Sequence, residues 1–331
     1  MLDDPARTRA LRLRAQGLTG SPTGDVEGVC GRLVGIQAQE LGFARLAFRP
    51  RCTGDVSASD VDAAVREGRL VWTWAMRGTL HLVRAADVAW LVGLLGPTFA
   101  TRGRPRRLAL GLDDAFCERA LAVIRDVLAT EGPQRRGTLA QRAGIDPRGQ
   151  APAHLLGLAA MRGLVRRVPA AAGRTPTFAL LESEPTPLSE DEALTRLGGR
   201  YLAGHGPATA QDLAAWSGIG LRRARRALAA AAIPTPASPG DEGPHVTLLG
   251  HFDPYLLGYA SRDLVLDPRH AKRIQAGGGF IAPAVLVDGR VVGTWRREEV
   301  DWLEPFEPLG AEVLAALERE RVDVERFAGG S

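Results

Sequence analysis

The sequence predicts a mainly helical α+β fold in which one plan, several helices followed by two strands, occurs three times. Apolar residues recur with helical spacing in most of the chain, and short glycine-containing turns separate pairs of short helices. The 331 residues are enough for two or three domains. We therefore expect three units in tandem, over 1–108, 109–187 and 188–331, arranged in an arc with a β-rich C-terminal portion.

The third repeat shows the plan most clearly. A long helix ends near 204–207, a short helix follows over about 209–216, and a tight turn at 217–220 leads into another helix. Thr209 and Asp212 have the spacing of a capping box. Two helices joined by a short turn are typical of the helix-turn-helix, so we expect winged-helix units. In that motif the second helix enters the major groove and would present Arg222, Arg223, Arg225 and Arg226 to DNA.

The other two repeats follow the same plan with more variation. The middle repeat predicts helices over 113–129, 135–145 and 151–168 and a wing strand over 173–181. The first repeat predicts two strands within 71–83, preceded by helices over 8–18, 26–39, 41–48 and 57–71.

The C-terminal portion predicts strands over 245–259 and 280–298. Asp288 and Gly289 between two apolar runs are a strong hairpin signal. Proline, glycine and charged residues accumulate near 101–112, 182–190 and 233–244, where we expect linkers.

Composition excludes several classes of protein. No stretch approaches the roughly 18 apolar residues of a membrane span, and the first ten residues have no apolar signal-peptide core. The scattered Cys30, Cys52 and Cys117 fit a reducing compartment and provide no zinc framework. We therefore expect a cytoplasmic protein that makes no contact with a membrane.

The basic residues are almost all arginine, because Lys272 is the only lysine. A GC-rich genome explains most of this bias, but arginine also binds phosphates and guanine edges with two parallel hydrogen bonds. The arginines cluster in 102–107, 135–136, 222–226 and 296–297. Such clusters indicate an anionic partner, although any single cluster is equally consistent with a solvated helix face.

Common catalytic motifs are absent from the sequence. It contains no phosphate-binding loop, no dinucleotide-binding glycine motif, no H-E-x-x-H and no G-x-S-x-G. The six histidines are dispersed, with no pair at metal-ligand spacing. We therefore expect neither a metal nor a cofactor.

Gln37 and Gln39 are separated by one residue. In a continuous helix this spacing places them on different faces, whereas in extended or broken-helix backbone they share one face. Gly35 and Gly42 make a break plausible. From spacing alone, the pair is more simply explained as solvated polar residues.

Three phrases of the sequence together resemble the AlkZ/YcaQ family of bacterial winged-helix DNA glycosylases. They are IQAQELGFARLAFRPR, MRGTLHLV and HFDPYLLGYASRDLVLDPRHAKRI followed by VLVDGRVVGTWR, in the family's order over nearly the whole chain. Gln37, Ala38 and Gln39 match the glutamine-apolar-glutamine motif of the AlkZ branch. The resemblance implies excision of bulky N7-alkylated guanines, unhooking of interstrand crosslinks made by genotoxic natural products, and a catalytic role for Gln37 and Gln39.

A neutral catalytic pair suits this reaction. A sugar glycosidase needs a carboxylic acid to protonate a poor leaving group, but an N7-alkylguanine already carries a positive charge and leaves as a neutral base. Amides are able to hold a water and stabilise a cationic sugar. A lyase mechanism requires an amine, and Lys272 lies in a predicted surface helix, so we expect a monofunctional hydrolase.

Other residues are weaker candidates. Arg45, Arg49 and Arg51 follow the glutamines at positions suited to phosphates, with a solvated helix edge as the equal alternative. In the MRGTLHLV phrase we expect Arg77 to contact DNA, and His81 either contacts DNA or is a core histidine. His251, Phe252 and Asp253 would line the site, although Asp253 before Pro254 also suits a turn. Arg296 and Arg297 end a predicted hairpin that would press on the minor groove.

The leading hypothesis is a monomeric, nucleoid-associated DNA glycosylase that acts on alkylated bases in double-stranded DNA, in repair or antibiotic self-resistance. The alternative is a winged-helix transcription regulator without catalysis, which would need no glutamine pair and would usually dimerise on an operator. A third possibility is a self-resistance protein that sequesters a toxin.

Overall fold

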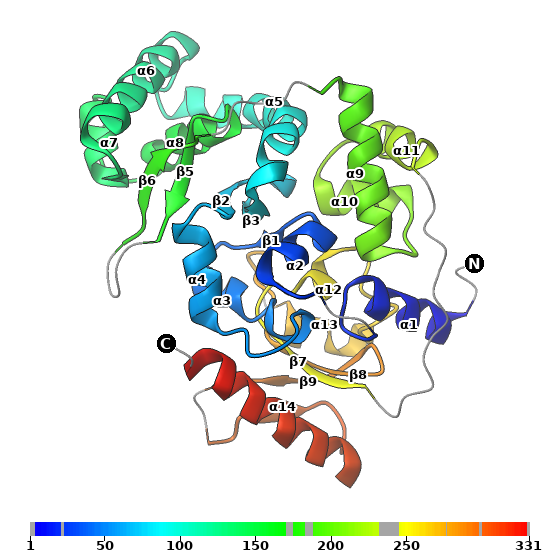
Figure 1. The fold of residues 1–331 in the computed structure, drawn as a ribbon. Coiled ribbons are helices and arrows are strands. Elements are labelled where there is room, and N and C mark those ends of the chain that lie inside the picture. The colour runs from blue at the N-terminus through cyan, green and yellow to red at the C-terminus, as the bar shows by residue number, and fades with distance from the viewer. Residues whose placement is uncertain are drawn as a thin grey trace. The chain divides into compact units, whose positions relative to one another are not determined.

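The computed structural model describes residues 4–20, 23–169, 175–182, 188–231, 245–275, 277–297 and 300–329. The chain forms two compact units (Figure 1). Unit 1 combines 1–63 with 195–331, and unit 2 comprises 64–194. Helices predominate and the strands pair antiparallel, which confirms the α+β fold class. No helix in the described ranges is long and apolar enough to span a membrane.

Unit 2 contains the winged helix predicted for the middle repeat. Its apolar core joins three helices to the two wing strands. A short first strand, β4, was not predicted. The loop of the wing, including residues 173 and 174 of the predicted strand, lies outside the described residues. The elements are α6 (Asp114–Glu131), β4 (Gln134–Arg135), α7 (Arg136–Arg142), α8 (Ala151–Met161), β5 (Val165–Val168) and β6 (Thr177–Leu180).

The strand pair predicted in the first repeat belongs to the same sheet of unit 2. β2 (Leu70–Trp74) pairs along its length with β3 (Leu80–Arg84) and also pairs with β5 through Trp72 and Arg167. Within unit 2 the strand order is β3-β2-β5-β6-β4. The first and middle repeats therefore share one sheet, which their sequences do not reveal.

The linker predicted near 101–112 is wrong over 101–109, which are helical, and only residues 110–112 belong to the connection between α5 (Ala85–Ala109) and α6. α5 is a continuous helix that includes Pro97 and Pro105. Its inner face packs against α8 so closely that a Cβ at Gly96 would lie 2.0 Å from the carbonyl oxygen of Met161. Since only glycine permits this approach, α5 is a core helix of unit 2 rather than a connector. The other predicted linkers fall largely on 183–187 and 232–244, outside the described residues.

The helices of unit 1 come from both ends of the chain, and α4 and α9 run across the unit boundaries. The helix-turn-helix of the third repeat is confirmed: α10 begins with the predicted capping box of Thr209 and Asp212. The helices are α1 (Pro5–Ala15), α2 (Val26–Leu33), α3 (Leu41–Arg45), α4 (Ala58–Arg66), α9 (Glu190–His205), α10 (Ala210–Ser217), α11 (Leu221–Ala229), α12 (Pro254–Leu257), α13 (Ala271–Ile274) and α14 (Ala311–Gly329). Short 3-10 helices cover Arg49–Arg51, Met76–Gly78 and Pro268–His270.

The sheet of unit 1 separates two apolar cores. Alternate residues of a strand point to opposite faces. Leu248 and Val285 pack with α14 on one face, whereas Leu249 and Leu286 pack on the other face with α1 and α12. Asp288 and Gly289 form the predicted hairpin turn, with φ of 46° and 74°. The strand order is β10-β9-β8-β7, for β7 (Val246–Leu249), β8 (Ala284–Val287), β9 (Arg290–Trp295) and β10 (Leu303–Pro305).

Several predicted elements are shorter than expected. The helix predicted over 151–168 ends at Met161, and its last four residues instead form β5, which pairs with β2 and β6. The helix over 26–39 ends at Leu33, because buried Val34 adopts a left-handed conformation with φ of 67°. The strand over 245–259 ends at Leu249, because the Asp253 carboxylate accepts a hydrogen bond from the Tyr255 amide and begins α12. The structure divides into two units. The three predicted ranges 1–108, 109–187 and 188–331 therefore stay a prediction.

One buried histidine in each unit makes the fold sensitive to acid. Burial lowers the pKa of His81 in unit 2 and of His205 in unit 1 to about 3. The unfolded chain binds a proton at each histidine below about pH 6.5, whereas the folded chain does not. Stability is therefore complete above about pH 6.5 and falls as the pH drops towards 3.

We expect each histidine to cost about 2 kcal/mol of unfolding free energy between pH 7.5 and pH 5. Urea unfolding at the two pH values measures the loss. His81→Phe and His205→Phe keep the ring volume, and each should remove one histidine's share of the difference. An unchanged pH dependence in both variants would show that other groups cause it.

Candidate functional site

The segment that carries Gln37 and Gln39 is extended rather than helical. β1 (Ile36–Gln37) begins just after α2, and residues 38–40 continue to α3 without helical structure. Ile36 and Ala38 are fully buried, whereas Gln37 is half-buried and Gln39 is exposed. This alternation places both amides on the outward side of the segment, as the extended alternative predicts.

The turn into α3 fixes where the segment ends. The amides of Phe43 and Ala44 both donate to the Glu40 carbonyl, so helical structure begins directly after the glutamines. α3 in turn lies against the end of β7, because a Cβ at Gly250 would lie 2.7 Å from the Leu46 Cβ. The glutamines therefore occupy a short bridge between two anchored helices of unit 1.

Arg49 and Arg51 are not available to phosphates, which corrects the prediction for these two residues, whereas the contact of Arg45 with DNA stays a prediction. Arg49 is 6% exposed and Arg51 is 1% exposed. Arg45 is partly exposed, but it makes two hydrogen bonds of 2.8 and 2.6 Å to the carboxylate of Asp62. A guanidinium that is buried and paired with a carboxylate is a structural group, so we exclude Arg49 and Arg51 from the DNA contacts.

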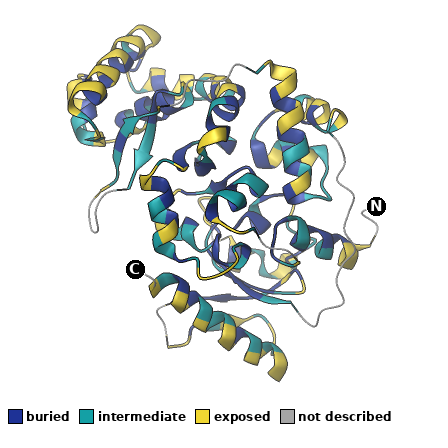
Figure 2. Ribbon diagram, viewed as in Figure 1, coloured by how far each residue is buried: buried dark blue, intermediate teal, exposed yellow. Residues whose placement is uncertain are grey.

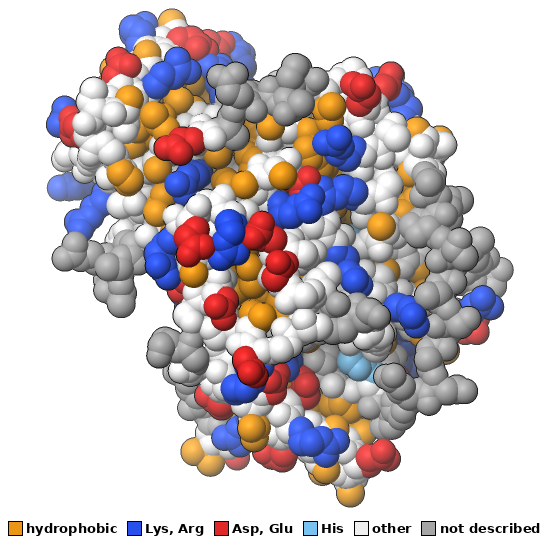
Figure 3. Space-filling model, viewed as in Figure 1, with side chains coloured by type: hydrophobic (Ala, Val, Ile, Leu, Met, Phe, Trp, Pro, Cys, Tyr) orange, Lys and Arg blue, Asp and Glu red, His pale blue; other side chains and the backbone are white. Residues whose placement is uncertain are grey.

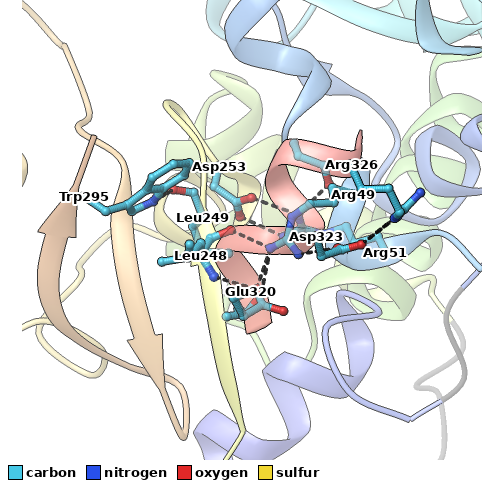
Figure 4. A network of polar contacts seen from close by, with 11 residues as sticks. Arg49, Arg51, Leu248, Leu249, Asp253, Trp295, Glu320, Asp323 and Arg326 are labelled. Atoms are coloured by element: carbon cyan, nitrogen blue, oxygen red, sulfur yellow. Dashed lines mark hydrogen bonds and ion pairs between the residues drawn. The ribbon is translucent and has the colours of Figure 1, made fainter. Parts of the chain in front are cut away.

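Arg51 forms a fully buried ion pair with Asp253, at 2.7 and 2.8 Å (Figure 4). Its remaining N–H groups donate to the Ala47 carbonyl and to the backbone and side-chain oxygens of Gln16. Every donor of the guanidinium is thus satisfied. The pair joins the 3-10 turn after α3 to the N-terminus of α12, so Asp253 holds the fold together and does not line the site as predicted.

Arg49 joins the same region to the C-terminal helix α14. It contacts Glu320 at 2.6 Å and Asp323 at 2.8 Å, and it donates to the Leu248 carbonyl (Figure 4). Burial by itself lowers the pKa of Arg49, but the two carboxylates outweigh burial and raise it. Hydrogen bonds from Arg49 and Arg326 likewise lower the pKa of Asp323 against the effect of burial.

His81 is a core histidine rather than a DNA contact. It is 2% exposed within β3, and its Nδ1 lies 2.9 Å from the Thr79 carbonyl oxygen. Desolvation and the charge of Arg77 keep the pKa of His81 low, so the ring is neutral at physiological pH. Arg77 is half-buried in the turn between β2 and β3, with φ of 57°; its contact with DNA stays a prediction.

His251 and Phe252 belong to an aromatic cluster that the sequence did not reveal. The ring centroid of Phe43 lies 4.1 Å from that of His251, and Phe280 lies 4.8 Å from His251 and 5.4 Å from Phe252. These residues come from three distant segments, α3, the end of β7 and the loop after α13. Only the resemblance pointed to His251 and Phe252, and no sequence signal identified Phe43 or Phe280.

The second helix of each described helix-turn-helix has a different surface. In α11, Ala224 and Ala227 are buried, whereas Arg222, Arg225 and Arg226 are exposed and Arg223 is half-buried. Figure 2 shows exposed residues along this helix. In α8, seven of the eleven residues are buried. α11 therefore has an arginine-rich face suited to DNA, whereas α8 is a core helix of unit 2.

Basic residues elsewhere are often paired with acids. Figure 3 shows acidic side chains among the basic ones on the face drawn. Arg296 and Arg297 are exposed after β9, and Arg297 lies 3.3 Å from Glu325. Their contact with the minor groove stays a prediction.

Neither the cavity of unit 2 nor a metal-binding group offers catalytic side chains among the described residues. Unit 2 has a cavity of about 540 Å³ between α5 and the end of α8, lined by apolar residues and Arg162. It contains no carboxylate or histidine among these lining residues. Among the described residues, no group of three or more His, Cys, Asp or Glu side chains is arranged to hold a metal ion.

Comparison with known proteins identifies the family. The AlkZ-like DNA glycosylase family matches residues 30–327. This chain belongs to the AlkZ-like DNA glycosylase family. It is 28% identical over 360 aligned positions to an interstrand DNA cross-link repair glycosylase of Streptomyces sahachiroi, covering 97% of this chain and 96% of that protein. The solved structure of Streptomyces sahachiroi DNA glycosylase AlkZ matches with a TM-score of 0.82 and 26% identity, over 99% of this chain and 98% of the other.

This AlkZ-like chain is therefore a DNA glycosylase, a hydrolase whose substrate is DNA. The family resemblance inferred from the sequence is confirmed, and so is the mainly helical α+β fold.

The buried pair of this AlkZ-like protein predicts a specific pattern of stability. Asp253→Ala leaves the Arg51 charge buried without its partner and should lower the unfolding free energy by about 3–5 kcal/mol. Arg51→Met combined with Asp253→Leu replaces both charges and should recover most of the loss. Urea unfolding measures both effects.

Arg69→Ala is the control for this comparison, because its pair with Glu67 lies at the surface. We expect a change within about 0.5 kcal/mol. A loss below about 1 kcal/mol for Asp253→Ala would contradict the structural importance of the buried pair.

Proposed function

We propose that the enzyme hydrolyses the N-glycosidic bond of cationic N7-alkylpurines in double-stranded DNA, with Gln37 and Gln39 as its catalytic residues. The observation that carries this proposal is the alternation in the segment, in which half-buried Gln37 follows buried Ile36 and exposed Gln39 follows buried Ala38. Neither residue titrates, so the pair suits a reaction that needs no proton donor for the leaving group.

The proposed chemistry follows from the charge of the lesion. Alkylation at N7 gives the purine a positive charge, and cleavage of the C1′–N9 bond leaves the electron pair on N9 and neutralises it. The oxygen of a water forms the new bond to C1′ and releases a proton to solvent. An amide oxygen accepts a hydrogen bond from this water, and its dipole stabilises the positive charge that develops on the sugar.

Bulky adducts and interstrand crosslinks extend the proposal. The relative from Streptomyces sahachiroi is named as an interstrand cross-link repair glycosylase. The exposure of Gln39 supports an open site that accepts a large substituent on the base. A role in self-resistance to a genotoxic natural product would follow from the same activity, carried out by a monomer in the cytoplasm near the nucleoid.

Membership of a glycosylase family argues against a transcription regulator without catalysis. A protein that only sequesters a toxin would also release no base. Measuring abasic sites in duplex DNA that contains N7-methylguanine separates the enzyme from both alternatives.

We expect Gln37→Ala together with Gln39→Ala to lower the single-turnover rate of N7-methylguanine release by at least about 100-fold, because both water positioning and charge stabilisation are lost. Gln37→Glu and Gln39→Glu, tested singly, keep an oxygen acceptor. Each should retain more activity than the single alanine variant at the same position. Binding to undamaged duplex serves as the control and should change little. Unchanged release by the double alanine variant would refute the catalytic assignment.

DNA binding by α11 is tested through salt dependence. Arg222→Ala and Arg225→Ala should each weaken binding to any duplex sequence and reduce the slope of log K against log salt by about 1. Arg319→Ala is a matched control, since Arg319 is an exposed arginine of α14. Equal salt slopes for all three variants and the unmodified protein would exclude α11 from the phosphate contacts.

A further inference from the structure

The aromatic cluster beside the glutamine segment is partly open to solvent. Phe280 is 38% exposed, and Phe43 and His251 are half-buried. The three rings are in contact, with centroids of 4.1 Å for Phe43–His251 and 4.8 Å for His251–Phe280. Phe252 lies beneath, edge-on to Phe280 at 83°. We call Phe43, His251 and Phe280 the aromatic platform.

The backbone holds Phe280 at the surface. Gly277, Gly278 and Gly279 have φ of 118°, 60° and 78°, a run of left-handed conformations that other residues rarely adopt. The Phe280 amide donates to the Gly277 carbonyl at 3.0 Å, and the Ala282 amide donates to Ile274 at 2.9 Å. The next side chain, Ile281, is buried in the core. The loop is therefore anchored, although Phe280 itself is exposed.

The aromatic platform carries no charge. The Nδ1 of His251 lies 3.1 Å from the Ile281 carbonyl oxygen, which fixes the ring. Burial lowers the pKa of His251, so the imidazole is neutral at physiological pH. An uncharged aromatic surface attracts a cation through its ring faces, and a protonated imidazole would repel one.

The aromatic platform also lies near the proposed catalytic residues. Phe43 follows Gln39 by four residues, and four residues of chain span at most about 14 Å. Because α3 begins at Leu41, the true separation is shorter than this limit. We infer from this limit that a damaged nucleotide with its sugar at the glutamines would have its base within reach of these rings.

We propose that the cationic N7-alkylated base stacks on the ring of the exposed Phe280, which His251 and Phe43 support at angles of 56° and 78°, and that the positive charge of the base distinguishes it from neutral guanine. This inference rests on the proposed function and adds a substrate-binding surface to it. A neutral guanine lacks the cation–π attraction to the Phe280 ring.

Replacing Phe280 tests the inference, because its side chain is exposed and its loss should leave the fold intact. We expect Phe280→Ala to lower the single-turnover rate of N7-methylguanine release, at enzyme concentrations below saturation, by about 10- to 100-fold. Phe280→Trp keeps a ring face and should retain most of the activity. Binding to undamaged duplex should change less than about 2-fold. Leu314→Ala, an exposed apolar residue of α14, is the matched control and should change neither measurement.

A series of fluorinated phenylalanines at position 280 separates charge recognition from simple apolar contact. Fluorine withdraws electron density from the ring face, so one, two and three fluorines should lower the rate stepwise. A flat series, or a Phe280→Ala variant as active as the unmodified protein, would overturn the assignment to a cationic base while the proposed function stands. Absence of base release by the unmodified protein would instead refute the proposed function, and the inference with it.

Discussion

The buried pair of Arg51 and Asp253 is the constraint on which the proposed catalytic region depends. The 3-10 turn that contains Arg51 lies just after the glutamine segment and α3, and Asp253 begins α12 some two hundred residues later. A charge in the interior is tolerated only when its hydrogen bonds are complete, and Arg51 uses all its donors. The turn after α3 therefore has one allowed position, and this fixes where the glutamine segment emerges.

Arg49 extends this constraint to the end of the chain. Its carboxylate partners Glu320 and Asp323 lie on α14, which covers one face of the unit 1 sheet. Glu320 also accepts hydrogen bonds from the Thr247 hydroxyl and the Leu248 amide of β7. Arg49 and Arg51, which look like DNA contacts in the sequence, thus connect the N-terminal segment to two distant parts of the fold.

Local signals predicted the elements well, because a capping box, an Asp-Gly turn or an amphipathic repeat acts over a few residues. Thr209 with Asp212 and Asp288 with Gly289 are examples, and both are present as expected. Such local signals do not predict which residues far apart in the sequence come into contact. Nothing near Arg51 indicates Asp253, and nothing near Phe43 indicates Phe280, because each partner is set by the tertiary fold. The predicted linker near 101–112 is wrong over 101–109 for the same reason, since packing on α8 keeps α5 helical through two prolines.

The discontinuity of unit 1 has a consequence for the order of events during synthesis. Domains generally fold as units while the chain emerges from the ribosome. Unit 2 is continuous and is complete once residue 194 has emerged, whereas unit 1 lacks its sheet and α14 until the last residues are made. The segment with Gln37 and Gln39 is among the first parts of the enzyme to be translated and among the last to acquire its supporting contacts. A nascent or prematurely terminated chain would therefore carry the glutamines without the geometry that we propose makes them catalytic.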